Sequence, residues 1–322
     1  MTEITASTAS DASIGVLTES ISPRRMALKR YMNNRAAVVS AAVLLIIVLV
    51  VALAPLTTRY GINESIYDAE EAPNQYLGPF DKAWFGTDGN GRDLYSRIIF
   101  GARVSLLIGL FTGIISVAIG TVIGAFAGLK GGRLDDLIMR ITDIALALPF
   151  LVVLVISRGV LENVSWATKV IGESTSVRFT VILLSVFGWM GVARLVRGQV
   201  KQLKEREFVE AARALGATTP RIMFRHLLPN AIGQIMVALT LAVVGAITAE
   251  ATLSFFGWGP DAGSGMTSLG LLIRDSKKAV PPGYWWLVVF PGVFFVILSL
   301  CINFIGDGLR DAADPKMQQE VK

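Results

Sequence analysis

Six long apolar stretches alternate with polar segments along the chain, and they limit its possible folds more than any other feature. Each is close to the ~20 residues that an α-helix needs to cross about 30 Å of hydrocarbon. They cover residues 36–56, 106–129, 137–157, 179–195, 231–256 and 287–305. A bilayer core leaves backbone polar groups without water partners, so single spanning segments must be helical. We therefore predict an all-α polytopic membrane protein with six transmembrane helices.

The composition agrees with a membrane protein. Hydrophobic residues make up 53% of the chain and charged residues only 17%, whereas soluble proteins carry about 25% charged residues. The net charge of +5 is then better explained by membrane topology than by nucleic-acid binding. A single cysteine, Cys301, excludes a disulfide within the chain and a cysteine-based metal cluster.

Basic residues predict the orientation of the spans. Five of them precede the first apolar stretch, namely Arg24, Arg25, Lys29, Arg30 and Arg35. Assigning this end to the cytoplasm places 19 of the 30 basic residues there, in agreement with the positive-inside rule. We therefore predict cytoplasmic tails over 1–35 and 309–322, an external segment over 57–102 and a transmembrane domain over 103–308.

Two further patterns concern packing and the membrane surface. Gly109 and Gly113, and then Gly120 and Gly124, have the spacing that lets membrane helices approach closely. Before the last apolar stretch, Tyr284, Trp285 and Trp286 predict an aromatic belt at the membrane interface.

A polar stretch between two spans, residues 201–230, predicts a helical hairpin. Phe208, Ala211, Ala212 and Leu215 recur at helical spacing and predict one narrow apolar face. Gly216 is expected to end the first helix, and Thr219 is expected to cap the second, with Pro220 at its first position. Such a hairpin suits docking of another protein. The alternatives are a DNA-binding helix-turn-helix, which the short tethers to both spans disfavour, and a passive loop on anionic lipid.

The hairpin resembles the EAA loop of ABC importer permeases, with Glu210-Ala211-Ala212, then Gly216, then Leu227-Leu228-Pro229. The resemblance implies a cytoplasmic coupling helix that sits in a groove of an ATPase subunit. The residues implied in coupling are Glu210, Ala211, Ala212, Arg213, Leu215, Gly216, Ala217, Arg221, Leu228 and Pro229.

The external segment carries a second, more specific pattern, made of Trp84, Phe85, Gly86, Thr87, Asp88, Gly91, Arg92 and Asp93. It resembles the C-type permease subunits of dipeptide and oligopeptide ABC importers, as do residues 253–257 and 303–311, so the likeness covers about 24–315. The resemblance implies the type I ABC importer permease fold in a bacterial inner membrane. It also implies a homologous second permease subunit, two ATPases that bind ATP and magnesium, an external binding protein and a peptide substrate. Import of glutathione or nickel stays open, because similar permeases carry them.

Two acidic residues, Asp143 and Glu250, fall within apolar stretches, and ionisable groups there suggest function. They leave open a self-contained secondary transporter. Asp143 lies one helical turn from Arg140 and can pair with it. Glu250 has no such partner in its own span, so it is expected to bond across helices or to face a wet pathway. Six spans without an internal repeat favour the permease.

Catalytic and metal-binding signatures are absent from the sequence. There is no GxxxxGK[ST] loop, so the chain is not expected to hydrolyse ATP, and it shows neither a nucleophile elbow nor a zinc signature. The one histidine, His226, is expected to face the membrane surface. We therefore predict a non-catalytic subunit without cofactor, metal or nucleic acid.

Overall fold

The computed structural model describes residues 23–66, 76–165, 169, 176–260, 265–278, 281 and 283–313. The predicted tails over 1–22 and 314–322 lie outside the described residues. The elements are helical, in the order α1 (Pro23–Asn33), α2 (Arg35–Ala52), α3 (Ala54–Thr57), α4 (Leu94–Lys130), α5 (Gly132–Ala147), α6 (Phe150–Glu162), α8 (Val177–Leu203), α9 (Glu207–Ala214), α10 (Thr219–Ile222), the π-helix η1 (Met223–Leu227), α11 (Leu228–Phe255), α12 (Leu269–Asp275), the 3₁₀-helix η3 (Ser276–Lys278) and α13 (Trp286–Ala313).

Among the described residues, five helices are long and apolar enough to cross a membrane: α2, α4, α8, the unbroken run Thr219–Phe255 that ends in α11, and α13. A sixth span results only if α5 and α6 count as one, and this pair is bent by 94°. The predicted span over 137–157 is therefore divided between two helices, α5 and α6. Leu148 is extended (φ −76°, ψ 143°), because the ring of the following proline, Pro149, disfavours the helical conformation of the residue before it.

The second span also differs from the prediction, because α4 begins at Leu94 rather than near residue 106. The carboxylate of Asp93 caps the helix by accepting the backbone N–H of Ser96 at 2.8 Å. The 37 residues of α4 are about 55 Å long at 1.5 Å per residue. Part of the predicted external segment is thus the first turns of a helix that exceeds the bilayer thickness.

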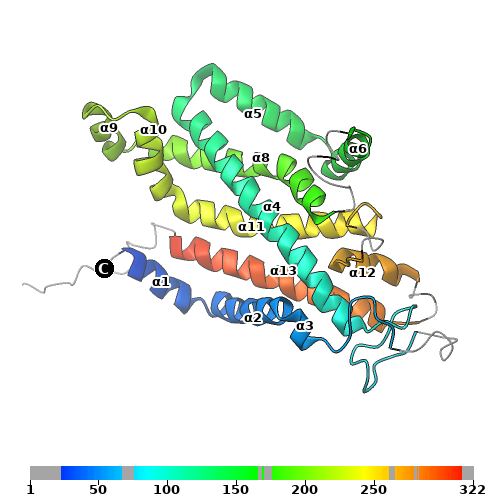
Figure 1. Ribbon diagram of the computed structural model, residues 1–322. Coiled ribbons are helices and arrows are strands. Elements are labelled where there is room, and N and C mark those ends of the chain that lie inside the picture. Colours follow the sequence, from blue (N-terminus) through cyan, green and yellow to red (C-terminus); the bar gives the residue numbers. More distant parts are fainter. Residues whose placement is uncertain are drawn as a thin grey trace, which may run out of the picture.

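Helix α4 is the centre of the bundle and crosses α8, α11 and α13 diagonally (Figure 1). A Cβ atom on Gly113 would lie 2.6 Å from the Val243 side chain of α11, and one on Gly120 would lie 2.6 Å from the carbonyl oxygen of Trp189 on α8. These contacts confirm the close approach that the glycine spacing predicts. The first pair of glycines serves α11 and the second pair serves α8.

Candidate functional site

The hairpin between α8 and α11 lies at one end of the bundle, where α9 and α10 project from the membrane helices (Figure 1). In α9, Val209 is completely buried and joins a hydrophobic cluster with Ile222 and Leu227. Ala212 is 8% exposed and lies on the same buried side. The single apolar face predicted for α9 is therefore divided between two sides, and Ala212 belongs to the inner one.

The outer side of α9 carries the other apolar residues of the predicted face. Phe208 is 39% exposed and Leu215 is 89% exposed, and Ala211 between them is also exposed. Large apolar side chains at this level of exposure indicate a surface that another molecule covers. The charged residues Glu210 and Arg213 of the same helix are exposed as well, as is Arg221 of α10. The outer side of α9 therefore combines a small apolar patch with exposed charged residues.

Gly216 ends α9 as predicted, with φ at +78°. The N–H of Ala217 donates to the carbonyl of Ala212 at 3.0 Å, and the N–H of Gly216 donates to that of Arg213 at 3.0 Å. This is the Schellman arrangement, which a glycine in the left-handed region permits. The glycine aims the chain into α10 and keeps Leu215 at the exposed tip.

The second helix of the hairpin begins one residue earlier than predicted, since Thr218 rather than Thr219 is its N-cap, without a side-chain hydrogen bond. It continues through η1 into α11, where the Leu228 N–H donates to the Met223 carbonyl. The π-turn absorbs one extra residue before Pro229, whose nitrogen has no hydrogen to donate. The second helix of the hairpin and α11 are consequently one unbroken helical rod, Thr219–Phe255.

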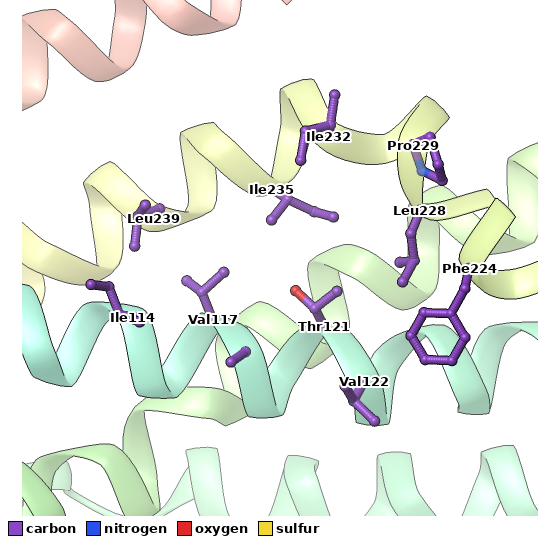
Figure 2. Close-up of a pocket in the computed structure, with 11 residues that line it drawn as sticks. Ile114, Val117, Thr121, Val122, Phe224, Leu228, Pro229, Ile232, Ile235 and Leu239 are labelled. Carbon is purple, nitrogen blue, oxygen red and sulfur yellow. The ribbon is translucent and has the colours of Figure 1, made fainter. Parts of the chain in front are cut away.

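Leu228, which the motif implies in coupling, faces α4. A groove of about 700 Å³ separates α4 from η1 and the first half of α11. Figure 2 shows Phe224 and Leu228 directed toward α4, where Thr121 and Val122 lie. Pro229 lines the same groove and is exposed. Leu228 thus faces the groove beside α4, Pro229 is exposed at the margin of this groove, and the outer patch of α9 lies elsewhere.

An ion-pair cluster that sequence reasoning missed ties α5 to α8 near the hairpin. The buried carboxylate of Asp135 pairs with Arg197, which donates a second bond at 2.8 Å, and with the Lys201 ammonium at 2.7 Å. Removing one partner of a buried pair leaves an uncompensated charge. The start of α5 is therefore fastened to the helix that leads into the hairpin.

The motif of the external segment surrounds a buried carboxylate, Asp88. It accepts the backbone N–H groups of Asn90 at 2.9 Å and Arg92 at 3.1 Å, and it pairs with the guanidinium groups of Arg92 and Arg97. Arg97 on α4 is 3% exposed. Asp88 thus neutralises a buried arginine and holds the loop on α4.

The rest of this motif packs against the beginning of α13. The Trp286 indole N–H donates to the carbonyl of Thr87 at 3.2 Å, and Phe85 stacks on Phe290 with ring centroids 4.2 Å apart. Gly86 is at φ +81°, and a Cβ atom there would lie 2.6 Å from the carbonyl of Leu77. Trp286 is buried under the loop, so it is not part of the predicted interfacial belt.

Three residues of the motif remain: Gly91 and Asp93, which precede α4, and Trp84, its first aromatic residue. Each has a separate role. Gly91 is at φ +69°, and Asp93 is the N-cap of α4. Trp84 stays half exposed, with the Arg59 guanidinium 4.4 Å from its ring centroid. The motif therefore forms a folded loop that packs on the N-terminal ends of α4 and α13.

Glu250 is completely buried and is held by hydroxyl groups from two helices. Ser105 of α4 donates to Oε2 at 2.8 Å, and Ser254 of α11 donates to Oε1 at 2.6 Å. The Ser105 hydroxyl also accepts the N–H of Leu269 at the start of α12. The expected bond across helices is confirmed, although Ser254 shows that Glu250 also has a partner in its own helix.

Asp143 pairs with Arg194 of α8 rather than with Arg140, so the predicted partner is wrong. Both side chains of the pair are more than half exposed. Residue 140 precedes Asp143 on the same helix, but the nearby α8 offers a second guanidinium. The pair forms a second bridge between α5 and α8.

The sequence predicts that the chain binds no metal and that His226 faces the membrane surface. Among the residues that the structure describes, no three His, Cys, Asp or Glu side chains are grouped as a metal site requires. His226 is half-buried within η1, where its carbonyl accepts the side-chain amide of Asn230 at 2.6 Å.

Comparison with known proteins gives consistent matches. Residues 120–319 match the family described as binding-protein-dependent transport system inner membrane component, and residues 22–79 match the N-terminal TM domain of oligopeptide transport permease C. The chain is 37% identical over 320 residues to the oligopeptide transport system permease protein OppC of Bacillus subtilis (strain 168), which covers 99% of this chain and 98% of the relative. It is 36% identical over 300 residues to the dipeptide transport system permease protein DppC of the same organism, covering 93% and 88%.

Among solved structures, the chain is similar to one from inward facing conformations of the MetNI methionine ABC transporter. The TM-score is 0.55 at 22% sequence identity, and the match covers 66% of this chain and 94% of the other. At this identity the likeness concerns the fold, which is that of a type I ABC importer permease.

Proposed function

Because the chain belongs to the family of binding-protein-dependent transport system inner membrane components, it is a non-catalytic, multi-pass permease subunit, and we propose that it imports peptides. It forms half of the translocation pathway of an ATP-driven importer of dipeptides or oligopeptides. The curated relatives named for dipeptide and oligopeptide transport support this substrate class. Glutathione and nickel, the alternatives from sequence, have no observation in their favour.

The observation that carries the proposal is the outer side of α9. Phe208 and Leu215 expose apolar side chains along α9, and this helix belongs to a hairpin that projects from the bundle. Exposing them to water costs about 25 cal/mol per Å² of apolar surface, and a groove on an ATPase subunit would remove that cost. Two such ATPases, one for each permease subunit, bind and hydrolyse ATP with magnesium.

The hairpin is connected to the membrane-spanning helices in a way that can transmit its movement to them. Thr219–Phe255 is one continuous rod, and the Asp135 cluster fastens α5 to the end of α8. A displacement of α9 by ATPase closure moves the Thr219–Phe255 rod with it, because Val209 of α9 packs with Ile222 and Leu227 in one buried cluster. The pathway alternates between inward and outward access, and a homologous second permease subunit completes it. An external binding protein delivers the peptide.

The two acidic residues suit structural roles better than proton coupling. Glu250 accepts hydroxyl hydrogen bonds on both oxygens, and Asp143 already pairs with an arginine. A proton carrier needs a carboxylate that reaches water on alternate sides. This comparison favours the permease over a secondary transporter.

The test of function uses the complete complex: the two permease subunits, the two ATPases and the binding protein, reconstituted in liposomes with ATP. We expect uptake of a radiolabelled peptide to require ATP and binding protein, and to persist when a protonophore collapses the proton gradient. Uptake that stops with the gradient while ATP is maintained, or uptake without the ATPases, would contradict the proposal. A panel of di-, tri- and pentapeptides, glutathione and nickel then identifies the substrate.

The proposed orientation places the hairpin and both termini in the cytoplasm. Lys82 in the external segment and Thr218 in the hairpin are both exposed. In a Cys301→Ser background, we expect Lys82→Cys to react with an impermeant maleimide in intact cells and Thr218→Cys to react only after permeabilisation. The reverse pattern would invert the topology and remove the coupling role of α9.

A further inference from the structure

Arg103 on α4 differs from the other arginines at the same end of the bundle. It is exposed, and it has no hydrogen bond or ion pair among the residues that the structure describes. Arg92 and Arg97 pair with Asp88, and Arg59 lies over the ring of Trp84. A charged side chain along a membrane helix requires a partner, because hydrocarbon cannot solvate it.

Arg103 lies at the edge of an apolar groove of about 520 Å³ between α2, α4, α11 and α13. These four helices come together where α4 crosses the lower part of the bundle in Figure 1. Twelve further residues line the groove, and only Thr240 among them is polar. Its hydroxyl donates to the carbonyl of Val237 at 2.9 Å, so the groove offers one cation and otherwise apolar walls.

The length of the groove along α2 is close to the thickness of one lipid leaflet. Val51 and Ala52, in the last turn of α2, line it together with Arg103, which places the guanidinium at the end of this span opposite the hairpin. Leu44 lies eight residues earlier on α2, or about 12 Å away at the rise of a helix. Half of a hydrocarbon core is about 15 Å. The groove therefore runs from the membrane interface toward the bilayer centre.

We propose that this groove binds one phospholipid from the leaflet opposite the hairpin. The phosphate accepts hydrogen bonds from the Arg103 guanidinium, and one acyl chain lies along α2 and α4. Arginine suits this role because its planar group binds phosphate oxygens with two parallel hydrogen bonds. The bound lipid holds α2 against α4, α11 and α13. This structural role goes beyond the transport function proposed above.

The surroundings of the groove favour lipid over a protein partner. Beside the groove, α2 exposes Leu45, Ile46 and Leu49. Only 17% of this helix is buried. Such a uniformly apolar outer surface is what a bilayer covers, whereas membrane helix interfaces are rich in small and polar residues. The competing occupant is a carboxylate of the second permease subunit at Arg103, and the experiment separates the two.

The test is native mass spectrometry of the assembled complex, released from nanodiscs of phosphatidylcholine containing phosphatidylglycerol. We expect the wild-type complex to retain a phosphatidylglycerol molecule through a detergent wash, and Arg103→Gln to lower this occupancy about five-fold, as expected for loss of one basic residue at an anionic lipid surface. Arg103→Lys should keep most of it, and excess inorganic phosphate should not displace it.

A matched pair of tryptophan variants on α2 tests the groove itself. Val48 lines the groove, whereas Leu45 does not and faces outward. We expect Val48→Trp to expel the lipid at unchanged charge and Leu45→Trp to leave it in place, with all subunits co-purifying in both. Equal lipid occupancy in wild type, Arg103→Gln and Val48→Trp would overturn the proposal. So would dissociation of the second permease subunit from Arg103→Gln with its lipid retained.

Discussion

Replacing Ala211 by tryptophan is expected to abolish ATP-driven uptake and to weaken co-purification of the ATPases at least ten-fold. Ala211 lies exposed between Phe208 and Leu215 on α9, so an indole there separates the patch from any groove that it enters. Losing the apolar contacts of one or two side chains costs about 1.5–3 kcal/mol each, and 1.4 kcal/mol is a factor of ten. Pull-down and peptide uptake, each normalised to permease level, measure the effect.

Two controls make this result specific. Ala211→Ser keeps the side chain small and should retain uptake. Ala36→Trp introduces the same indole at an exposed alanine of α2, outside the hairpin, and should leave ATPase binding unchanged. Normal pull-down and normal uptake by Ala211→Trp would remove α9 as the docking surface.

Ala212, which the predicted apolar face includes, is unsuitable for this test. It is nearly buried against the rest of the hairpin, so a tryptophan there would overpack the interior and disturb the fold as well as docking. The neighbouring alanines therefore answer different questions: Ala211 reports on the partner, and Ala212 reports on the hairpin.

Replacing Asp88 by asparagine is expected to destabilise the outer end of the protein strongly. The change keeps the side-chain shape and removes the charge that neutralises the buried Arg97. Breaking a buried pair by removing one charge costs about 3–5 kcal/mol, which corresponds to a fall of about 4–7 °C in the unfolding temperature for a protein of this size. Thermal unfolding of the purified complex, followed by tryptophan fluorescence, measures this fall.

Asp81 provides the matched control, because it lies in the same external segment and is exposed. Asp81→Asn should change the unfolding temperature by less than ~2 °C, since surface substitutions usually stay within about 0.5 kcal/mol. Similar unfolding temperatures for both variants would contradict the account of Asp88 as the neutralising group of the folded loop.

Long-range pairs are details of the structure that the sequence leaves open. Asp143 pairs with an arginine 51 residues away, and Ser105 reaches Glu250 across 145 residues. Trp286 was expected at the interface by composition, yet it bonds to a carbonyl 199 residues earlier. Each partner depends on the rotation and separation of two helices, and no local pattern specifies those.

The sequence by itself determined the approximate positions of the apolar stretches and the glycine-terminated hairpin. These features depend on segment length, hydropathy and local backbone preference. All three are properties of residues that are close together in the sequence. Only the tertiary structure decided that α5 and α6 form a bent pair and that α4 begins at Leu94. It also decided that α9 turns Val209 inward and Leu215 outward. An apolar side chain at helical spacing can pack against its own chain, lipid or a partner protein. The packing of the other helices decides which of these it contacts.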